Sequence, residues 1–224
     1  MSKLLHNWRM QLTAGATLAG AADAQVRYTD RSWGYGAHRV SETRQPLLLG
    51  RRVVVTGMAG AGKSTFSREL AARTGLPLVY LDLYRWDPGW VRKSADEFRE
   101  VQQVLLAGEE WIVDGNVAID LRVGRADSVV FLDTPWWLCA RRAFMRGLRR
   151  RRPPLPDGCD DTLRRRLRDE WWLVWRIWLG RRSERDLELG YLSRHEKHVV
   201  LHVLRSKREA RELLEGLPRA GVGP

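Results

Sequence analysis

The stretch GMAGAGKST, residues 57–65, decides how the rest of the chain is interpreted. It fits the pattern of a glycine, four residues and then Gly-Lys-Ser/Thr that forms a phosphate-binding loop. The β-branched run at 52–56 precedes it and predicts a buried strand. The run at 64–74 follows it and predicts a helix that ends at Gly75. A strand, a glycine-rich turn and a helix are the context that this pattern requires.

Such a loop binds anions for physical reasons. Its glycines allow the backbone to curl, so that successive N–H groups point at one anion. The first turn of the helix adds N–H groups without partners and the positive end of the helix dipole. We expect Lys63 to contact the β- and γ-phosphates of ATP, and the Ser64 hydroxyl to bind Mg²⁺. The expected nucleotide-binding residues are Gly57, Ala59, Gly60, Ala61, Gly62, Lys63, Ser64 and Thr65.

Length and composition limit the class of protein. The chain has 224 residues, of which 44% are hydrophobic, which is enough for one α/β domain with extra segments. Its net charge of +12 favours anionic partners such as nucleotides, nucleic acid or acidic lipid. The two cysteines, Cys139 and Cys159, have no metal-binding spacing and predict a reduced, cytoplasmic protein. No apolar run reaches membrane-spanning length, so we expect no membrane partner.

The first fifty residues carry the weakest structural signal. The stretch 12–24 is rich in Ala, Gly and Thr and resembles a secretory signal only faintly. Residues 27–46 are polar and show no period, which is typical of a linker. We therefore expect a poorly ordered extension over 1–50 and a folded domain over 51–218.

Strand-like and helix-like segments alternate through the rest of the chain. Apolar runs predict further strands at 78–81, 111–114, 128–133 and 199–203. Helices are expected at about 94–107, 136–147, 161–179 and 206–214, and residues 83–90 are expected to form a loop. Ser94, with Glu97 three residues later, predicts a capped helix start. The alternation predicts an α/β fold with a five-stranded parallel sheet.

Three aspartates are predicted to follow strands of that sheet. Ligands of such sheets bind at the carboxyl ends of the strands, where Asp82, Asp114 and Asp133 fall. Asp114 and Asp133 both suit the role of holding Mg²⁺. Asp82 suits a role on the acceptor side, where a carboxylate orients a hydroxyl or takes its proton. The alternative for each is a helix cap or a turn residue, because Asp favours both.

Four segments together resemble a known family. They are GMAGAGKST at 57–65, LDLYRWDPGW at 81–90, WIVDGN at 111–116 and ADSVVFLDTPWWLCARRAFMR at 126–146. Over about 51–215 the chain resembles P-loop kinases of the adenylate kinase-like group and, within it, the DNA topology modulation protein family. The resemblance implies a three-layer P-loop NTPase fold and a small-molecule kinase that uses ATP and Mg²⁺. In that group an Asp-Gly pair faces the magnesium, which favours Asp114 over Asp133.

The resemblance also implies roles for residues outside the loop. Arg142 and Arg146 fall four residues apart on one helix face. The adenylate kinase-like group has two arginines at these positions, and their implied roles are to stack on the base and to clamp the transferring phosphoryl group. Asp82, Trp86, Trp90 and Asn116 are the expected acceptor-binding residues. The arginine-bearing pattern of nucleoside monophosphate kinases is replaced by residues 116–118, Asn-Val-Ala, which argues against a monophosphate acceptor.

The segment between the fourth and fifth strands is where this group inserts its mobile lid. Seven arginines lie between 141 and 152, and we expect a lid region over about 147–190. Lid arginines close over ATP and neutralise charge in the transition state. The helix expected at 161–179 carries an apolar stripe that we expect to pack in the core rather than to stack on bases. The stripe consists of Leu163, Leu167, Trp171, Val174, Trp175 and Trp178.

Two functions of other classes compete with the kinase. Basic residues beside aromatic residues also permit nucleic-acid binding, which would make the chain a P-loop NTPase that affects DNA topology. No helix-turn-helix, zinc-finger or RNA-recognition pattern accompanies them, so this partner is not favoured. The third function is that of a nucleotide-binding regulator without turnover.

Overall fold

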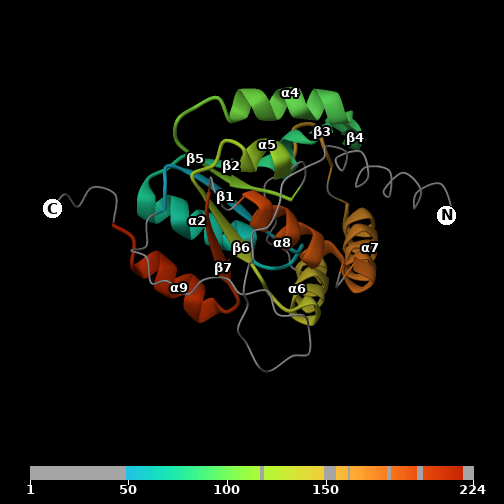
Figure 1. Cartoon of the computed structure of the whole chain (residues 1–224). Coiled ribbons are helices and arrows are strands. Elements are labelled where there is room, and N and C mark those ends of the chain that lie inside the picture. The colour runs from blue at the N-terminus through green and yellow to red at the C-terminus, as the bar shows by residue number, and fades with distance from the viewer. Residues whose placement is uncertain are drawn as a thin grey trace. The chain divides into compact units, whose positions relative to one another are not determined.

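The computed structural model describes residues 49–116, 119–148, 155–160, 162–180, 183–195 and 199–218 (Figure 1). The chain divides at residues 43 and 44 into two units, and all described elements belong to the second unit, residues 44–224. Almost all of the expected N-terminal extension at 1–50 therefore lies outside the described residues, and its order stays a prediction.

The second unit is built on a five-stranded parallel sheet in the order β2-β5-β1-β6-β7. The α/β fold with this sheet is therefore confirmed. β1 lies at the centre, and its residue Val55 is in register with Asp114 of β5 and Val130 of β6. This register brings the end of β5 beside the start of the phosphate-binding loop. The strands are β1 (Arg52–Gly57), β2 (Leu78–Tyr80), β5 (Trp111–Asp114), β6 (Ser128–Leu132) and β7 (Val200–Leu204).

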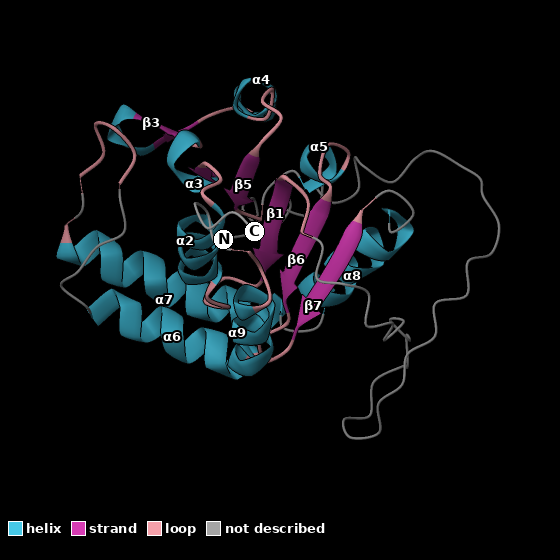
Figure 2. Cartoon of the chain, turned by 90° about the vertical axis from the view of Figure 1, so that its left-hand side faces the viewer, coloured by secondary structure: helices cyan, strands magenta, loops and turns pink. Residues whose placement is uncertain are grey.

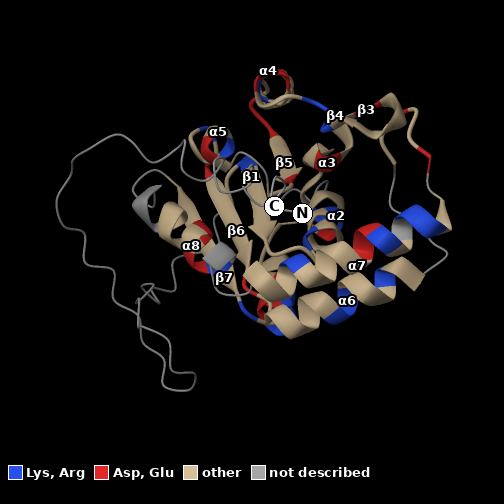
Figure 3. Ribbon diagram, turned by 90° about the vertical axis from the view of Figure 1, so that its right-hand side faces the viewer, with Lys and Arg blue, Asp and Glu red and all other residues tan. Residues whose placement is uncertain are grey.

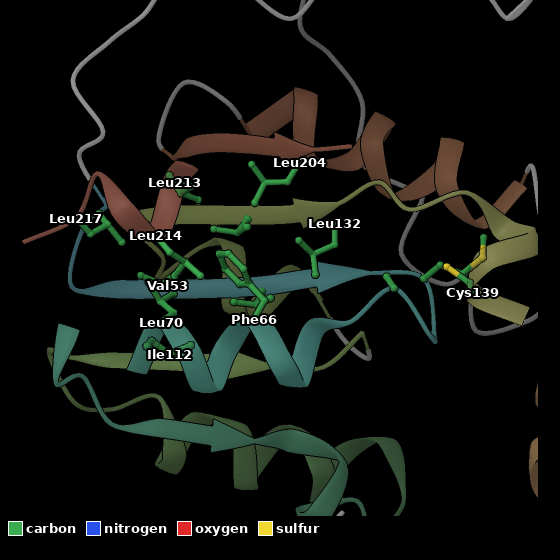
Figure 4. Close-up of a cluster of buried hydrophobic side chains, with 14 of the residues drawn as sticks. Val53, Phe66, Leu70, Ile112, Leu132, Cys139, Leu204, Leu213, Leu214 and Leu217 are labelled. Atoms are coloured by element: carbon green, nitrogen blue, oxygen red, sulfur yellow. The ribbon is translucent and has the colours of Figure 1, made fainter. Parts of the chain in front are cut away.

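Helices cover both faces of the sheet and make three layers (Figure 2). Side chains alternate along β1, so Val53 and Val55 lie in one buried cluster and Val54 lies in the other. The first cluster is drawn in Figure 4 and receives side chains from α2 (Lys63–Thr74), α6 (Trp136–Leu148), α7 (Leu163–Gly180) and α9 (Lys207–Glu215). The second receives them from α3 (Leu81–Tyr84), α4 (Ala95–Leu105), α5 (Ile119–Val123) and α8 (Ser183–His195).

Local sequence signals set the helix ends. The Ser94 hydroxyl accepts from the Glu97 amide at 3.2 Å, and the Glu97 carboxylate accepts from the Ser94 amide at 2.8 Å. This reciprocal cap begins α4 as the sequence predicts. At α9 the Ser206 hydroxyl accepts from the Glu209 amide at 3.1 Å, but the Glu209 carboxylate accepts from the Arg205 amide instead, at 2.7 Å.

The segment after β2 differs from the prediction. Residues 83–90 are not a plain loop, because Asp82 already lies in the first turn of α3 and a two-stranded hairpin follows. The hairpin consists of β3 (Trp86–Asp87), a 3₁₀ turn (Pro88–Trp90) and β4 (Val91–Arg92). Gly89 has a φ of +74°, which allows the tight reversal between two strands too short to give a sequence signal. Below, residues 86–92 are called the β3–β4 hairpin.

The orientation of α7 also differs from the prediction. Trp171, Trp175 and Trp178 are 65%, 44% and 47% exposed, so the expected stripe does not lie in the core. Ile177 is only 1% exposed and Leu173 packs beside it, so another face of α7 is buried. The helix carries apolar residues on most of its circumference, and its period alone does not choose between two apolar faces.

Contact with α6 fixes the face that α7 buries. A Cβ on Gly147 of α6 would lie 3.2 Å from Cβ of Glu170, so the two helices approach closely at that point. Arg146 and Glu170 form an ion pair beside this contact. In the described part of the chain, no helix has both the length and the hydropathy to span a membrane.

Candidate nucleotide-binding site

The loop of residues 57–62 joins β1 to α2 and is shaped by backbone contacts. Gly57 has a φ of +130°, and a Cβ there would lie 2.6 Å from the carbonyl oxygen of Leu132. Gly60 has a φ of +84°, and a Cβ there would collide with the backbone of Cys139. Side chains are excluded at both positions, so the loop lies against the end of β6 and the start of α6. The first amides of α2, which have no partners within the helix, point out of its N-terminus.

Lys63 folds back over this loop. Its Nζ atom donates hydrogen bonds to the carbonyl oxygens of Gly57 at 2.8 Å and Met58 at 3.1 Å. Burial lowers the pKa of Lys63, and the negative charges of Asp114, Asp82 and Glu188 oppose that change. The lysine is therefore buried within reach of the charges of three carboxylates at the end of the sheet.

Asp114 lies beside Ser64, the first residue after the lysine. Asp114 is 5% exposed, and the Ser64 side chain is near enough to act on its carboxylate. Burial raises the pKa of Asp114, while Lys63 and the Ser64 hydrogen bond oppose the increase. A hydroxyl and a carboxylate side by side are oxygen ligands that suit Mg²⁺, which takes its other ligands from water and phosphates. These residues therefore fit the predicted metal, although the described residues include no group of three or more His, Cys, Asp or Glu that could hold an ion.

Asp133 has a different environment. Arg185 of α8 donates to both of its carboxylate oxygens, at 2.6 and 2.7 Å, and Arg205 lies 3.9 Å away. Of the two aspartates that the sequence offers for Mg²⁺, Asp114 lies beside Ser64 and Asp133 is paired with arginines.

Asn116 and Glu188 complete the surroundings of the loop. Asn116 donates from Nδ2 to the carbonyl oxygen of Gly57 at 2.6 Å. Its Oδ1 atom is buried and has no hydrogen-bond partner among the described residues. Glu188 of α8 accepts from the Thr56 hydroxyl at the end of β1. The pocket between them is lined by Met58, Asn116, Phe131, Leu132, Asp133, Thr134, Arg185 and Glu188.

Glu188 and Arg185 are not among the site residues predicted from the sequence. Both lie in α8, a helix that was not predicted and whose apolar residues do not gather on one face. Arg122 was missed as well: it is fully buried in α5 and donates to the carbonyl oxygen of Gly115. A basic residue inside a short apolar stretch is the sequence signal that could have identified it.

The two arginines predicted to act together have different partners. Arg142 donates from Nη1 to the carbonyl oxygen of Ala61 at 2.9 Å and lies 3.4 Å from that of Gly60. Arg146 makes two hydrogen bonds to Glu170 of α7, at 2.6 and 2.9 Å. Arg142 therefore contacts the phosphate-binding loop directly, whereas Arg146 contacts α7.

The expected acceptor residues lie in and before the β3–β4 hairpin. Asp82 is exposed, and its charge acts on both Lys63 and Asp114. Trp86 and Trp90 meet edge to face, with ring centroids 5.7 Å apart. Trp90 donates to the carbonyl oxygen of Asp160 at 2.8 Å, so the segment 155–160 that precedes α7 contacts this hairpin.

Comparison with protein-family models and with curated proteins gives no match. Solved structures similar to the chain include a shikimate kinase from Acinetobacter baumannii in complex with shikimate, at 19% identity over 74% of this chain and 89% of that one, with a TM-score of 0.42. A gluconokinase from Sinorhizobium meliloti 1021 matches at 19% identity over 75% and 91% of the two chains, with a TM-score of 0.42. A sugar kinase from Janibacter sp. HTCC2649 matches at 18% identity over 74% and 91%, with a TM-score of 0.40. These similarities are too remote to carry an argument about the reaction.

Proposed function

We propose that this chain is an ATP- and Mg²⁺-dependent phosphotransferase that acts on a small-molecule acceptor. One observation carries the proposal: the buried carboxylate of Asp114 and the hydroxyl of Ser64 lie close together beside Lys63, at the N-terminus of α2. A main-chain anion site, a mobile cation and two oxygen ligands for a metal are together what a nucleoside triphosphate requires.

The loop residues bind and orient the nucleotide. The amides of the loop and of the first turn of α2 hold the phosphates, and Lys63 moves from the carbonyl oxygens of Gly57 and Met58 to the β- and γ-phosphates. Ser64 and Asp114 would hold Mg²⁺, which would supply neutralisation of charge on the phosphate oxygens when bound. Arg142, already at the loop, adds positive charge where the transferring group develops negative charge.

The acceptor reacts through one of its hydroxyl groups. Its oxygen forms a bond to the γ-phosphorus, the bond from that phosphorus to the β–γ bridging oxygen breaks, and ADP leaves. Asp82 takes the hydroxyl proton, since it is exposed beside Lys63 and Asp114. Trp86, Trp90 and Asn116 shape the acceptor pocket. Arg146 releases its hydrogen bonds to Glu170 and forms new ones to the phosphates.

The insertion of residues 147–190 is proposed as the lid. Its closure would exclude water from the reacting phosphate. A kinase of this type works where ATP and Mg²⁺ are supplied, which agrees with the cytoplasmic location expected from cysteine usage. Membership of the DNA topology modulation protein family stays a prediction from the sequence.

ATP consumption against a panel of hydroxyl compounds tests the proposal. We expect acceptor-dependent ADP release from the natural chain and a loss of about 10²-fold or more in Lys63→Ala, because one preorganised charge is worth that much in such sites. Lys207→Ala, at an exposed position of α9, is the matched control and should keep the natural rate. Unchanged turnover in Lys63→Ala would refute the proposal. ATP binding without product from any acceptor would favour the regulator instead.

A further inference from the structure

The outward side of α7 carries a stripe of basic and aromatic side chains. Its five members recur at steps of four and three residues, which places them on one side of the helix. All five are exposed, whereas Ile177, on another side of the helix, is buried in the core. The stripe consists of Arg164, Arg168, Trp171, Trp175 and Trp178. Two arginines thus precede three tryptophans along one line of the helix.

A second stripe of the same kind lies on α6. Its four members recur at the same steps and are all exposed. They are Trp137, Arg141, Phe144 and Leu148. Figure 3 shows α6 and α7 side by side, with basic positions on both helices. Below, the two sets of residues are called the α6–α7 stripes, and neither set includes an acidic residue.

The acidic residues of these two helices lie off the stripes and are already paired. The sequence of α6 has three arginines and no acidic residue, and that of α7 has five arginines and two acidic residues. Glu170 accepts from Arg146 at 2.6 Å. Asp169 accepts from Arg168 at 3.1 Å and lies 3.5 Å from Nε of Arg165. Because exposed pairs of this kind add little to stability, Arg168 can exchange its carboxylate for another anion.

A surface of this composition restricts the kind of partner. Several exposed tryptophans close together typically mark an interaction site. A second copy of the chain would bring two basic faces together, which opposes self-association. Nucleic acid is bound through stacked rings and polar side chains, but the leucine of α6 cannot stack and the stripes hold no Ser, Thr, Asn or Gln. Arginine beside tryptophan and leucine is typical of a helix on the surface of an anionic bilayer.

We propose that α6 and α7 bind the surface of an anionic lipid bilayer, with the apolar side chains of the stripes among the upper acyl chains and the arginines at the lipid phosphates. Tryptophan suits this level because its ring is largely apolar and its N–H can face the headgroups. The inference goes beyond the proposed phosphotransferase and does not depend on it. The sequence predicted no membrane partner because no apolar run could cross a bilayer. A helix at the surface needs no such run, since it buries one face by only about 5–10 Å.

Cosedimentation of the full chain with lipid vesicles tests the inference. One set of vesicles contains phosphatidylcholine alone, and the other contains equal parts of phosphatidylcholine and phosphatidylglycerol. We expect the chain to bind the anionic vesicles about tenfold or more tighter than the neutral ones, because each arginine near such a surface contributes about fivefold. Added salt should weaken this binding, since it screens the charges. Lipids brominated in their acyl chains should quench the tryptophan fluorescence of the bound chain.

Substitutions assign the binding to the stripes. We expect Trp171→Gln and Phe144→Gln each to weaken binding to the anionic vesicles about tenfold, because each removes aromatic area from the bilayer. Arg164→Gln should weaken it about fivefold, and Arg164→Lys, which retains the charge, should restore it. Val104→Gln in α4 and Arg211→Gln in α9 are the matched controls at exposed positions outside the stripes. Both controls should bind like the natural chain.

The other possible partners of the stripes give different results. Absence of binding to the anionic vesicles, or binding that is unchanged in Trp171→Gln and Phe144→Gln, would refute the inference. A dimer in sedimentation velocity that dissociates in Trp171→Gln, without vesicle binding, would overturn it in favour of a second copy. Binding of a single-stranded oligonucleotide that the same variants weaken, again without vesicle binding, would overturn it in favour of nucleic acid. Vesicle binding needs no nucleotide, so its failure leaves the proposed phosphotransferase unaffected.

Discussion

Arg185 donates hydrogen bonds to both carboxylate oxygens of Asp133, at 2.6 and 2.7 Å, and so joins α8 to the end of β6. The Asp133 side chain is 11% exposed, so this ion pair is shielded from water more than most surface pairs are. A second contact, from Glu188 to the Thr56 hydroxyl, holds the same helix at the end of β1. The helical segment that precedes β7 is thus attached to the sheet next to the phosphate-binding loop.

This relationship predicts that the two strand-end aspartates have different functions. We expect Asp114→Asn to abolish Mg²⁺-dependent turnover without lowering the unfolding temperature at pH 7, because burial already disfavours the charged carboxylate there. We expect Asp133→Asn to lose about 1–3 kcal/mol of unfolding free energy, with an unchanged Mg²⁺ requirement. Thermal unfolding and Mg²⁺ titration of turnover measure both effects. A changed Mg²⁺ requirement in Asp133→Asn would contradict the assignment of the metal to Asp114.

We expect the buried side chain of Arg122 to contribute strongly to the free energy of unfolding. Its side chain is fully buried, donates to the carbonyl oxygen of Gly115 and lies within reach of the charge of Glu188. Burial lowers its pKa to about 10, so it remains charged at pH 7. Arg122→Met should lower the unfolding free energy by about 3 kcal/mol, because the acidic groups around it lose their counter-charge. Arg125→Met, at an exposed position three residues later, should change it by less than about 0.5 kcal/mol in urea unfolding.

We expect the burial of His202 to make the stability of the fold depend on pH. It lies in β7, its Nε2 atom is buried without a hydrogen-bond partner among the described residues, and burial lowers its pKa from the ordinary value of 6.5. Below about pH 6.5 the unfolded chain binds a proton that the folded chain does not. The free energy of unfolding therefore decreases as the pH is lowered. His202→Leu should therefore lose less stability than the natural chain between pH 7.5 and 5.5. Identical losses in thermal unfolding would show that His202 titrates normally in the fold.

The orientation of α7 predicts which of its apolar residues matter for stability. Ile177 is buried, so Ile177→Ala should cost about 2–4 kcal/mol of unfolding free energy. Trp171 is 65% exposed, so Trp171→Gln should cost less than about 1 kcal/mol. Urea unfolding of the two variants measures both costs. A larger cost at Trp171 than at Ile177 would mean that the stripe expected from the sequence is the buried face after all.

Several features of the site could be predicted because their signals are local. The phosphate-binding loop is defined by nine consecutive residues, and the cap of α4 by Ser94 and Glu97. The strands β5 and β6 were located to within a residue, because buried β-branched runs are short and uniform. The hairpin after Asp82 was missed because two-residue strands have no period, and α8 was missed because its apolar residues do not follow one face.

The sequence by itself determined an anion-binding loop between a strand and a helix, and a parallel sheet to support it, since glycine spacing and apolar runs act within a few residues of themselves. The tertiary structure alone decided that Asp114 lies beside Ser64 while Asp133 pairs with Arg185, and that α7 exposes its tryptophans. These choices depend on which strand ends become neighbours and which helix faces meet, and residues far apart in the chain settle them together.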